Sequence, residues 1–147
     1  MDLNDLQRNF ENAVEQTIKD LEPVMEQAAL TAKALLARRV QNTGFGRRYR
    51  SGGYKKLRAS KGYEIRFVNL TFTGEMFRNW KRPDHYRRGF VIGGSVGGTD
   101  TSSVNKLKWN KSRYPTFDRV SDEEKDIITN SFLKPKIAEL LEKNLLR

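Results

Sequence analysis

Cysteine is absent from the 147-residue sequence, and histidine occurs once, as His85. The first absence excludes a disulfide framework, a thiol nucleophile and a cysteine-based metal site, and a single histidine leaves no cluster for zinc. The acidic residues of the middle region (Glu64, Glu75, Asp84 and Asp100) are isolated, so no carboxylate pair suited to acid–base chemistry or metal binding is visible. The sequence therefore predicts a protein that is not an enzyme and that holds no metal and no cofactor.

Long apolar runs are missing as well. No segment reaches the roughly 20 apolar residues of a membrane span, and the most apolar one, residues 28–37, is interrupted by Lys33. The acidic, amphipathic start of the chain does not have the pattern of a secretion signal. We therefore expect a soluble protein without membrane contact, folded as a single domain over residues 1–147.

Positive charge is abundant, and it is unevenly placed. Residues 38–113 contain 19 Lys and Arg and 4 Asp and Glu, a net charge of +15, whereas the two flanks together have a net charge of −5. A basic middle between acidic ends predicts a strongly positive face or edge. Phosphate backbones and acidic protein surfaces are the partners that such a face attracts.

Residues 43–62 form the densest part of this region, rich in glycine and basic residues and without a single acid. Loops longer than about 12–15 residues are uncommon in compact domains and are usually functional or disordered. We interpret the segment as an extended basic arm that neighbouring subunits hold in order. Its expected partner-binding residues are Arg47, Arg48, Tyr49, Arg50, Tyr54, Lys55, Lys56 and Arg58.

Residues 3–41 show apolar residues at steps of three and four, the period of an amphipathic helix. This stripe is expected to pack on the protein's own sheet, with packing on a neighbouring subunit as the alternative. Pro23 predicts a kink or break near residues 20–22, because proline removes a helix hydrogen bond. Residues 42–44 (Asn-Thr-Gly) supply a stop signal.

Strand patterns follow the arm. Residues 63–72 and 86–92 alternate or are rich in strand formers, and residues 104–111 fit either a strand or a short helix. Between them, Thr73 can cap a short helix, residues 82–84 (Arg-Pro-Asp) indicate a turn, and residues 93–100 indicate a flexible glycine-rich turn. Ser121 begins a capping box that opens a terminal helix, which Pro135 is expected to bend or restart.

The order of these elements resembles the tail-completion and head–tail connector proteins of tailed bacteriophages. Those proteins often contain a Thr-Gly before a short apolar segment, as in residues 70–76, and an Arg-Pro-aromatic turn before an acidic helix start. Here proline follows tyrosine in residues 113–117, so the second motif is a variant. The residues that carry the resemblance are Thr73, Gly74, Met76, Arg113, Pro115 and Ser121.

The resemblance implies an α+β fold, with a long N-terminal helix and a C-terminal helix packed on a small antiparallel sheet of about four strands. It implies a structural virion protein of the neck or tail, which assembles in the host cytoplasm. The partners would be further copies of the chain in a ring, with the portal or adaptor above and the tail below. Contact with the DNA in the channel would be non-specific.

The alternative function is nucleic-acid binding through the basic arm. Eleven of the fifteen aromatic residues lie in residues 38–113, interleaved with basic side chains, and this mixture suits backbone tracking and base stacking. Strand aromatics more often form a core, however, and an arginine-rich arm binds acidic protein surfaces equally well.

Overall fold

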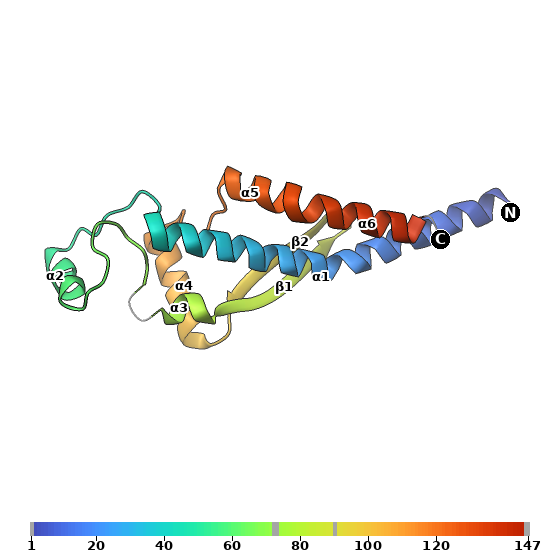
Figure 1. Cartoon of the computed structure of the whole chain (residues 1–147). Coiled ribbons are helices and arrows are strands. Elements are labelled where there is room, and N and C mark those ends of the chain that lie inside the picture. The colour runs from blue at the N-terminus through green and yellow to red at the C-terminus, as the bar shows by residue number, and fades with distance from the viewer. Residues whose placement is uncertain (1, 72–73, 90, 146–147) are drawn as a thin grey trace. The chain divides into compact units, whose positions relative to one another are not determined.

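The computed structural model describes residues 2–71, 74–89 and 91–145 and confirms an α+β protein with long N- and C-terminal helices (Figure 1). The elements are α1 (Leu3–Thr43), α2 (Gly52–Ser60), α3 (Glu75–Asn79), β1 (Trp80–Arg88), β2 (Val91–Gly98), α4 (Thr101–Arg113), α5 (Asp122–Ile128), the π-helix η1 (Thr129–Leu133) and α6 (Lys134–Leu145).

The residues cluster into two compact units. One, the terminal unit, comprises residues 1–31, 83–96 and 122–147, and the other, the arm unit, comprises residues 32–82 and 97–121. Helix α1 and both strands contribute residues to each unit. The assignment of a single domain stays a prediction.

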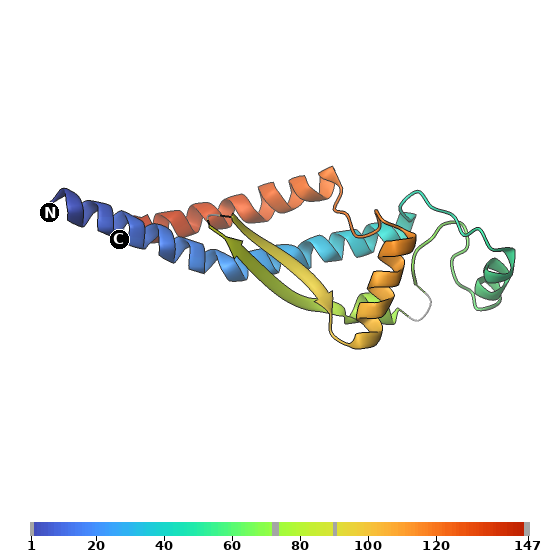
Figure 2. The same cartoon turned by 180° about the vertical axis from the view of Figure 1, so that it is seen from behind.

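The expected sheet of about four strands is wrong for the described residues, where β1 and β2 pair as one antiparallel hairpin (Figure 2). Residues 63–71 alternate in sequence but form no strand. Their backbone groups bond elsewhere, because Arg58 takes the carbonyl oxygens of Glu64 and Thr71. Leu70 also has a φ of 54°, which is incompatible with an extended strand.

The hairpin turn lies at Gly89, with a φ of 61°, and not at either predicted turn. Residues 82–84 lie inside β1, and most of the glycine-rich segment 93–100 lies inside β2. Gly93 and Gly94 allow close packing and do not form a turn. A Cβ at Gly94 would stand 2.1 Å from the carbonyl oxygen of Met25 on α1, and one at Gly93 would stand 2.2 Å from the Tyr86 ring.

Helix α1 continues through Pro23, so the predicted break near residues 20–22 is wrong. Within the terminal unit, α6 runs antiparallel beside the first part of α1 (Figures 1 and 2), and Lys143 and Asn144 bond to Asp20 and Thr17. These contacts before Pro23, with the hydrogen bond between Glu26 and His85 after it, help to offset the proline's cost of about 3 kcal/mol. The helix ends at Thr43, as predicted, and Gly44 follows with a φ of 69°.

The helices after the hairpin agree with the sequence patterns. Residues 104–111 lie in α4, which settles the choice between strand and helix, and Asp100 caps this helix by accepting from the Ser103 amide at 2.8 Å. Helix α5 starts directly after Ser121. The π-helix η1 then precedes α6, so the helix restarts next to Pro135, as expected.

Burial differs between the two units. Among the described residues, the arm unit buries eight apolar side chains (Leu36, Val40, Tyr49, Val68, Met76, Phe77, Trp80 and Phe117), whereas the terminal unit buries Ile18, Ala28 and Ile128. The apolar stripe of α1 is largely exposed where the helix begins, since Leu3, Leu6 and Phe10 are 83%, 57% and 60% exposed. The terminal unit therefore presents apolar surface that its own core does not use.

Candidate partner-binding site

The basic arm is not extended throughout, because residues 52–60 form helix α2. Ser51 caps this helix, its side-chain oxygen accepting from the Tyr54 amide at 3.2 Å. Gly62, with a φ of 70°, follows the last turn and allows the chain to leave it. The arm is therefore a small folded loop built around one helix.

Arg58 is the centre of that loop and is 1% exposed. Its Nε and Nη1 donate to the carbonyl oxygens of Glu64 and Thr71, both at 2.8 Å, and its Nη2 donates to Asn69 Oδ1 at 2.9 Å. The guanidinium also lies over the Tyr49 ring, 4.6 Å from the ring centre. Arg58 thus joins α2 to the chain that follows it.

A second tie runs from the segment before α2 to the same chain. The hydroxyl of Tyr49 donates to Asn69 Oδ1 at 3.1 Å, and the Val68 amide donates to the Arg47 carbonyl oxygen at 2.8 Å. Burial of Tyr49 raises the pKa of its hydroxyl above the usual 10.0. The arm is therefore ordered from within the chain, whereas the sequence led us to expect that neighbouring subunits supply this order.

Arg47, Arg48 and Arg50 are exposed. Together with Arg113 and Tyr114 they line a concave site of about 240 Å³. Within residues 2–71, 74–89 and 91–145, the guanidinium groups of the three arm arginines have no hydrogen bond or ion pair. Unpaired like charges around one hollow attract an anion.

An apolar pocket of about 400 Å³ lies beside the arginine site and shares Arg50, Arg113 and Tyr114 with it. Its walls are chiefly aromatic and aliphatic, from Tyr49, Tyr54, Val68, Leu70, Trp109 and Tyr114, and Ser51, Asn110 and Lys106 complete it. We call the two hollows together the arm pocket. It can take a ligand that is both apolar and negatively charged.

Helix α4 supplies the second wall. Trp109 is 60% exposed, and the guanidinium of Arg113, one helical turn later, stacks 5.4 Å from the centre of its ring. The next residue, Tyr114, contacts Phe45 edge to face with ring centres 5.4 Å apart. The side chain of Lys106 pairs with Glu75 of α3 and so fixes the two short helices to each other.

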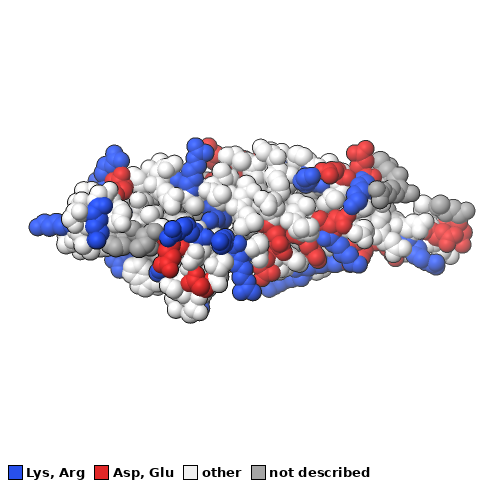
Figure 3. Space-filling view, turned by 60° about the horizontal axis from the view of Figure 1, so that its bottom comes forward, with Lys and Arg blue, Asp and Glu red and all other residues white. Residues whose placement is uncertain are grey.

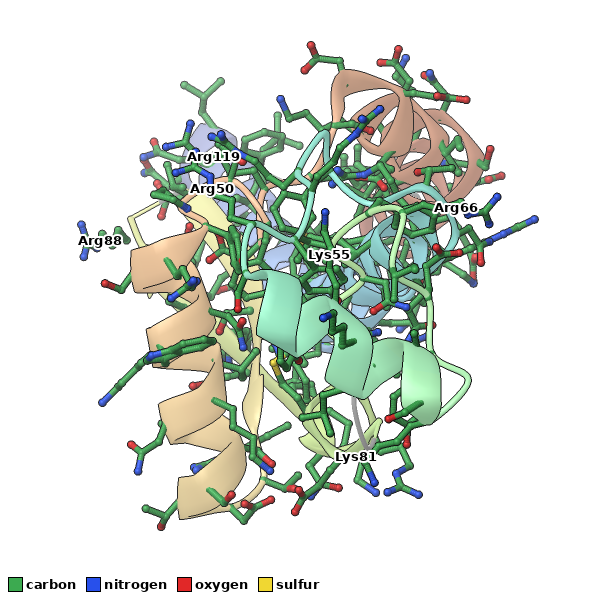
Figure 4. All side chains as sticks on the ribbon, turned by 90° about the vertical axis from the view of Figure 1, so that its left-hand side faces the viewer. Arg50, Lys55, Arg66, Lys81, Arg88 and Arg119 are labelled. Carbon is green, nitrogen blue, oxygen red and sulfur yellow. The ribbon has the colours of Figure 1, made fainter. Side chains whose placement is uncertain are left out.

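The predicted site residues divide into two groups. Arg58 and Tyr49 are buried and hold the arm together, whereas Arg47, Arg48, Arg50 and Tyr54 line the arm pocket. Lys55 and Lys56 lie on α2 outside the pocket lining, and Figure 4 labels Arg50 and Lys55 on this side of the arm unit. Fewer of the arm's basic residues line the pocket than its composition suggested.

The residues that carry the family resemblance are scattered. Arg113 lines the arm pocket, and Met76 is buried against Asn110 of α4. Gly74 precedes α3 with a φ of 74°, Pro115 follows α4, and Ser121 precedes α5. Thr73 lies outside the described residues.

Sequence reasoning missed Trp109 and Lys106 as pocket residues. The four-residue spacing of Trp109 and Arg113 was a usable signal, because on a helix it places an aromatic ring beneath a cation. The sequence alone did not reveal this signal, because residues 104–111 were also compatible with a strand, on which the four-residue spacing has no such meaning.

Charge follows the division into units. The arm unit contains 19 Lys and Arg and 4 Asp and Glu, a net charge of +15, and the terminal unit has a net charge of −5. Figure 3 shows Lys and Arg side chains over α2 and Asp and Glu side chains over the first turns of α1. The uneven charge of the sequence is therefore a property of two folded regions.

Comparisons with protein-family models, curated proteins and solved structures found no match for this chain. Within the described part of the chain, no group of three or more His, Cys, Asp or Glu residues could hold a metal ion. No helix there is both long and apolar enough to cross a membrane.

Proposed function

We propose that this chain is a structural virion protein, a ring-forming subunit of a bacteriophage head–tail connector or tail-completion complex. It joins the portal or adaptor to the tail, resides in the neck or tail of the particle, assembles in the host cytoplasm, and catalyses no reaction. The observation that carries the proposal is the division of charge between the two units, +15 against −5.

Opposite charge on two different regions of one chain favours contact between unlike surfaces of neighbouring copies. Such heterologous contacts form a ring when the rotation between copies closes. The exposed apolar residues of the terminal unit support the same conclusion, since large unburied apolar patches usually mark interaction surfaces. The sequence resemblance supplies the phage context.

The test is the composition of purified particles. The chain should co-purify with tailed particles in several copies, and density for it should lie between the portal and the tail. A chain that is made during infection but is absent from mature particles would contradict the proposal and would favour an assembly factor.

Nucleic-acid binding remains the second candidate. Arg47, Arg48 and Arg50, which have no ionic partner among the described residues, and the exposed Trp109, which shares a pocket with Arg50, favour it. Affinity for DNA that depends on these contacts should fall steeply with salt. A monomer with such an affinity, not found in particles, would establish this alternative instead.

A further inference from the structure

The first turns of α1 present an apolar surface that no other described residue covers. Leu3, Leu6 and Phe10 are spaced by three and four residues, so they form one apolar stripe on the helix. All three are strongly exposed, with values of 83%, 57% and 60%. We call residues 2–11 the acidic end of α1.

Acidic side chains flank that stripe. The Asp2 carboxylate accepts from the Asp5 amide at 2.8 Å and so caps α1. Glu11 lies one helical turn beyond Gln7, whose side-chain amide donates to the Glu11 carboxylate at 2.9 Å. With Arg8 as the single base, residues 2–11 have a net charge of −2. The acidic end is therefore apolar on one face and negative around it.

The arm pocket has the complementary chemistry. Its apolar part, about 400 Å³, is bounded by Trp109, Tyr54 and Leu70. The adjoining part is lined by Arg47, Arg48 and Arg50, whose guanidinium groups have no partner in the part of the chain that the structure describes. Pockets of about 300–1,000 Å³ bury compact apolar groups well. The pocket has room for apolar side chains of one helix face, with arginines beside it for the carboxylates.

We propose that the acidic end of α1 from one copy of the chain docks in the arm pocket of the next copy. This inference rests on the proposed function, because it specifies the contact by which copies assemble. Leu6 and Phe10 enter the apolar part of the pocket, and the carboxylates of Asp2, Asp5 and Glu11 pair with the arm arginines. Each copy gives one end and offers one pocket, so the contact propagates head to tail.

Two surface variants test this contact by analytical ultracentrifugation. The end variant is Leu6→Asp with Phe10→Asp, and the pocket variant is Arg50→Glu with Arg113→Glu. Matched controls change an exposed apolar residue and an exposed base outside both surfaces, Val91→Asp and Arg88→Glu. Circular dichroism and thermal melting should show that all four variants retain the wild-type fold.

The wild-type chain should self-associate with increasing concentration, and each test variant should weaken association by at least about tenfold in Kd, a change of about 1.4 kcal/mol. The controls should associate like the wild type. An equimolar mixture of the two test variants should form a dimer and nothing larger, because one intact end still meets one intact pocket. Docking within a single chain would give no such dimer.

A wild-type chain that stays monomeric near 1 mM would overturn the inference, because even contacts of about −4 kcal/mol populate a complex at that concentration. Test variants that associate like the wild type would also overturn it, and so would a mixture of the two test variants that stays monomeric. Loss of DNA affinity in the pocket variant with unchanged association would assign the pocket to nucleic acid. Normal incorporation of both variants into particles would refute the docking alone, whereas absence of the wild-type chain from particles would refute the proposed function.

Discussion

Arg58 occupies the place that an apolar side chain takes in most small cores. In the described part of the chain its charge meets no carboxylate. Its partners are two carbonyl oxygens, one amide oxygen, the Tyr54 hydroxyl and three tyrosine rings within 5.7 Å. The planar guanidinium suits this environment because it can donate in several directions while stacking on aromatic faces. The neighbouring Glu64 is engaged instead by Arg66, which holds the pKa of that carboxyl at about 2.

Replacing Arg58 by Met should destabilise the arm unit by about 3 kcal/mol, because the carbonyl oxygens of Glu64 and Thr71 lose the Arg58 donor and Asn69 Oδ1 loses one of its donors. Arg58→Lys should recover little of this loss, since one ammonium cannot reproduce the fork of donors. Urea denaturation of both variants measures the effect. Lys56→Ala, at an exposed position of the same helix, should stay within about 0.5 kcal/mol of the wild type.

His85 on β1 lies between two carboxylates of α1. Its Nδ1 is 2.7 Å from Glu26 Oε1, and its Nε2 is 3.4 Å from Glu22 Oε2. The hydrogen bond to Glu26 raises the pKa of His85 above its usual 6.5, and the negative charges of Glu22, Glu26 and Asp84 add to this effect. The protonated imidazole therefore links the hairpin to α1 within the terminal unit.

Because the pKa is higher in the folded state, the stabilisation from His85 is complete below pH 6.5 and is lost as the pH rises through the raised value. We expect the wild type to lose stability over this interval relative to His85→Gln, whose stability should change less. Thermal melts from pH 5.5 to about 8.5 compare the two, with the window set by typical histidine titration. If the melting temperatures of the two proteins changed with pH in parallel, stabilisation by protonated His85 would be contradicted.

At the scale of elements, the hairpin shows that a glycine-rich segment can form a strand where the sequence predicts a turn. Residues 93–98 contain four glycines and were expected to form a flexible turn, yet they form the strand β2. Gly94 is needed because a main-chain carbonyl of α1 occupies the space of its missing side chain. The strand approaches the helix more closely than a side chain permits.

Gly94→Ala should therefore destabilise the protein by about 2–3 kcal/mol, because the new methyl group would meet the Met25 carbonyl oxygen and force the strand and helix apart. Gly97→Ala on the same strand is the control. There the nearest atom, the Arg82 carbonyl oxygen, is 4.0 Å from the added Cβ. Chemical denaturation should separate the two variants, and equal losses would show that strand glycines matter only for backbone entropy.

Local patterns predicted the helices better than the sheet. The apolar period of residues 3–41, the stop at Thr43 and the start after Ser121 all depend on residues close in sequence, and the structure confirms them. The break at Pro23 was wrong because residues distant in the sequence support α1. The strand over the described residues 63–71 was wrong because a side chain outside that segment, Arg58, bonds to its backbone. Helix α6 and Gly94 support α1 around Pro23, and Arg58 takes the backbone acceptors that a strand at residues 63–71 would have used.

At the scale of the whole molecule, the charge of the chain is arranged for association rather than only for solubility. A region of +15 and a region of −5 in one chain attract each other between copies. The basic character of the site could be read from the sequence. The pocket could not, because its aromatic wall comes from α4, more than 50 residues beyond the arm arginines.

Self-association should consequently depend on ionic strength. Raising NaCl from about 0.05 M to about 0.5 M shortens the screening length to a few ångströms and should weaken association several-fold. The apolar contacts of Leu6 and Phe10 should leave a residual association that salt does not remove. Sedimentation at three salt concentrations measures both contributions, and association that strengthens with salt would mean that apolar contacts alone drive it.

The contacts that stabilise the arm join residues that are close in the sequence, so each contact closes only a short loop. Arg58, Tyr49 and Asn69 join residues that all lie between positions 47 and 71. Since the entropic cost of closing a loop grows with its length, this segment can fold early and open as one cooperative unit. Hydrogen exchange should show the amides of α2 and Val68 protected to the same degree. A partner then meets a surface whose ordering entropy was lost during folding rather than at the moment of binding.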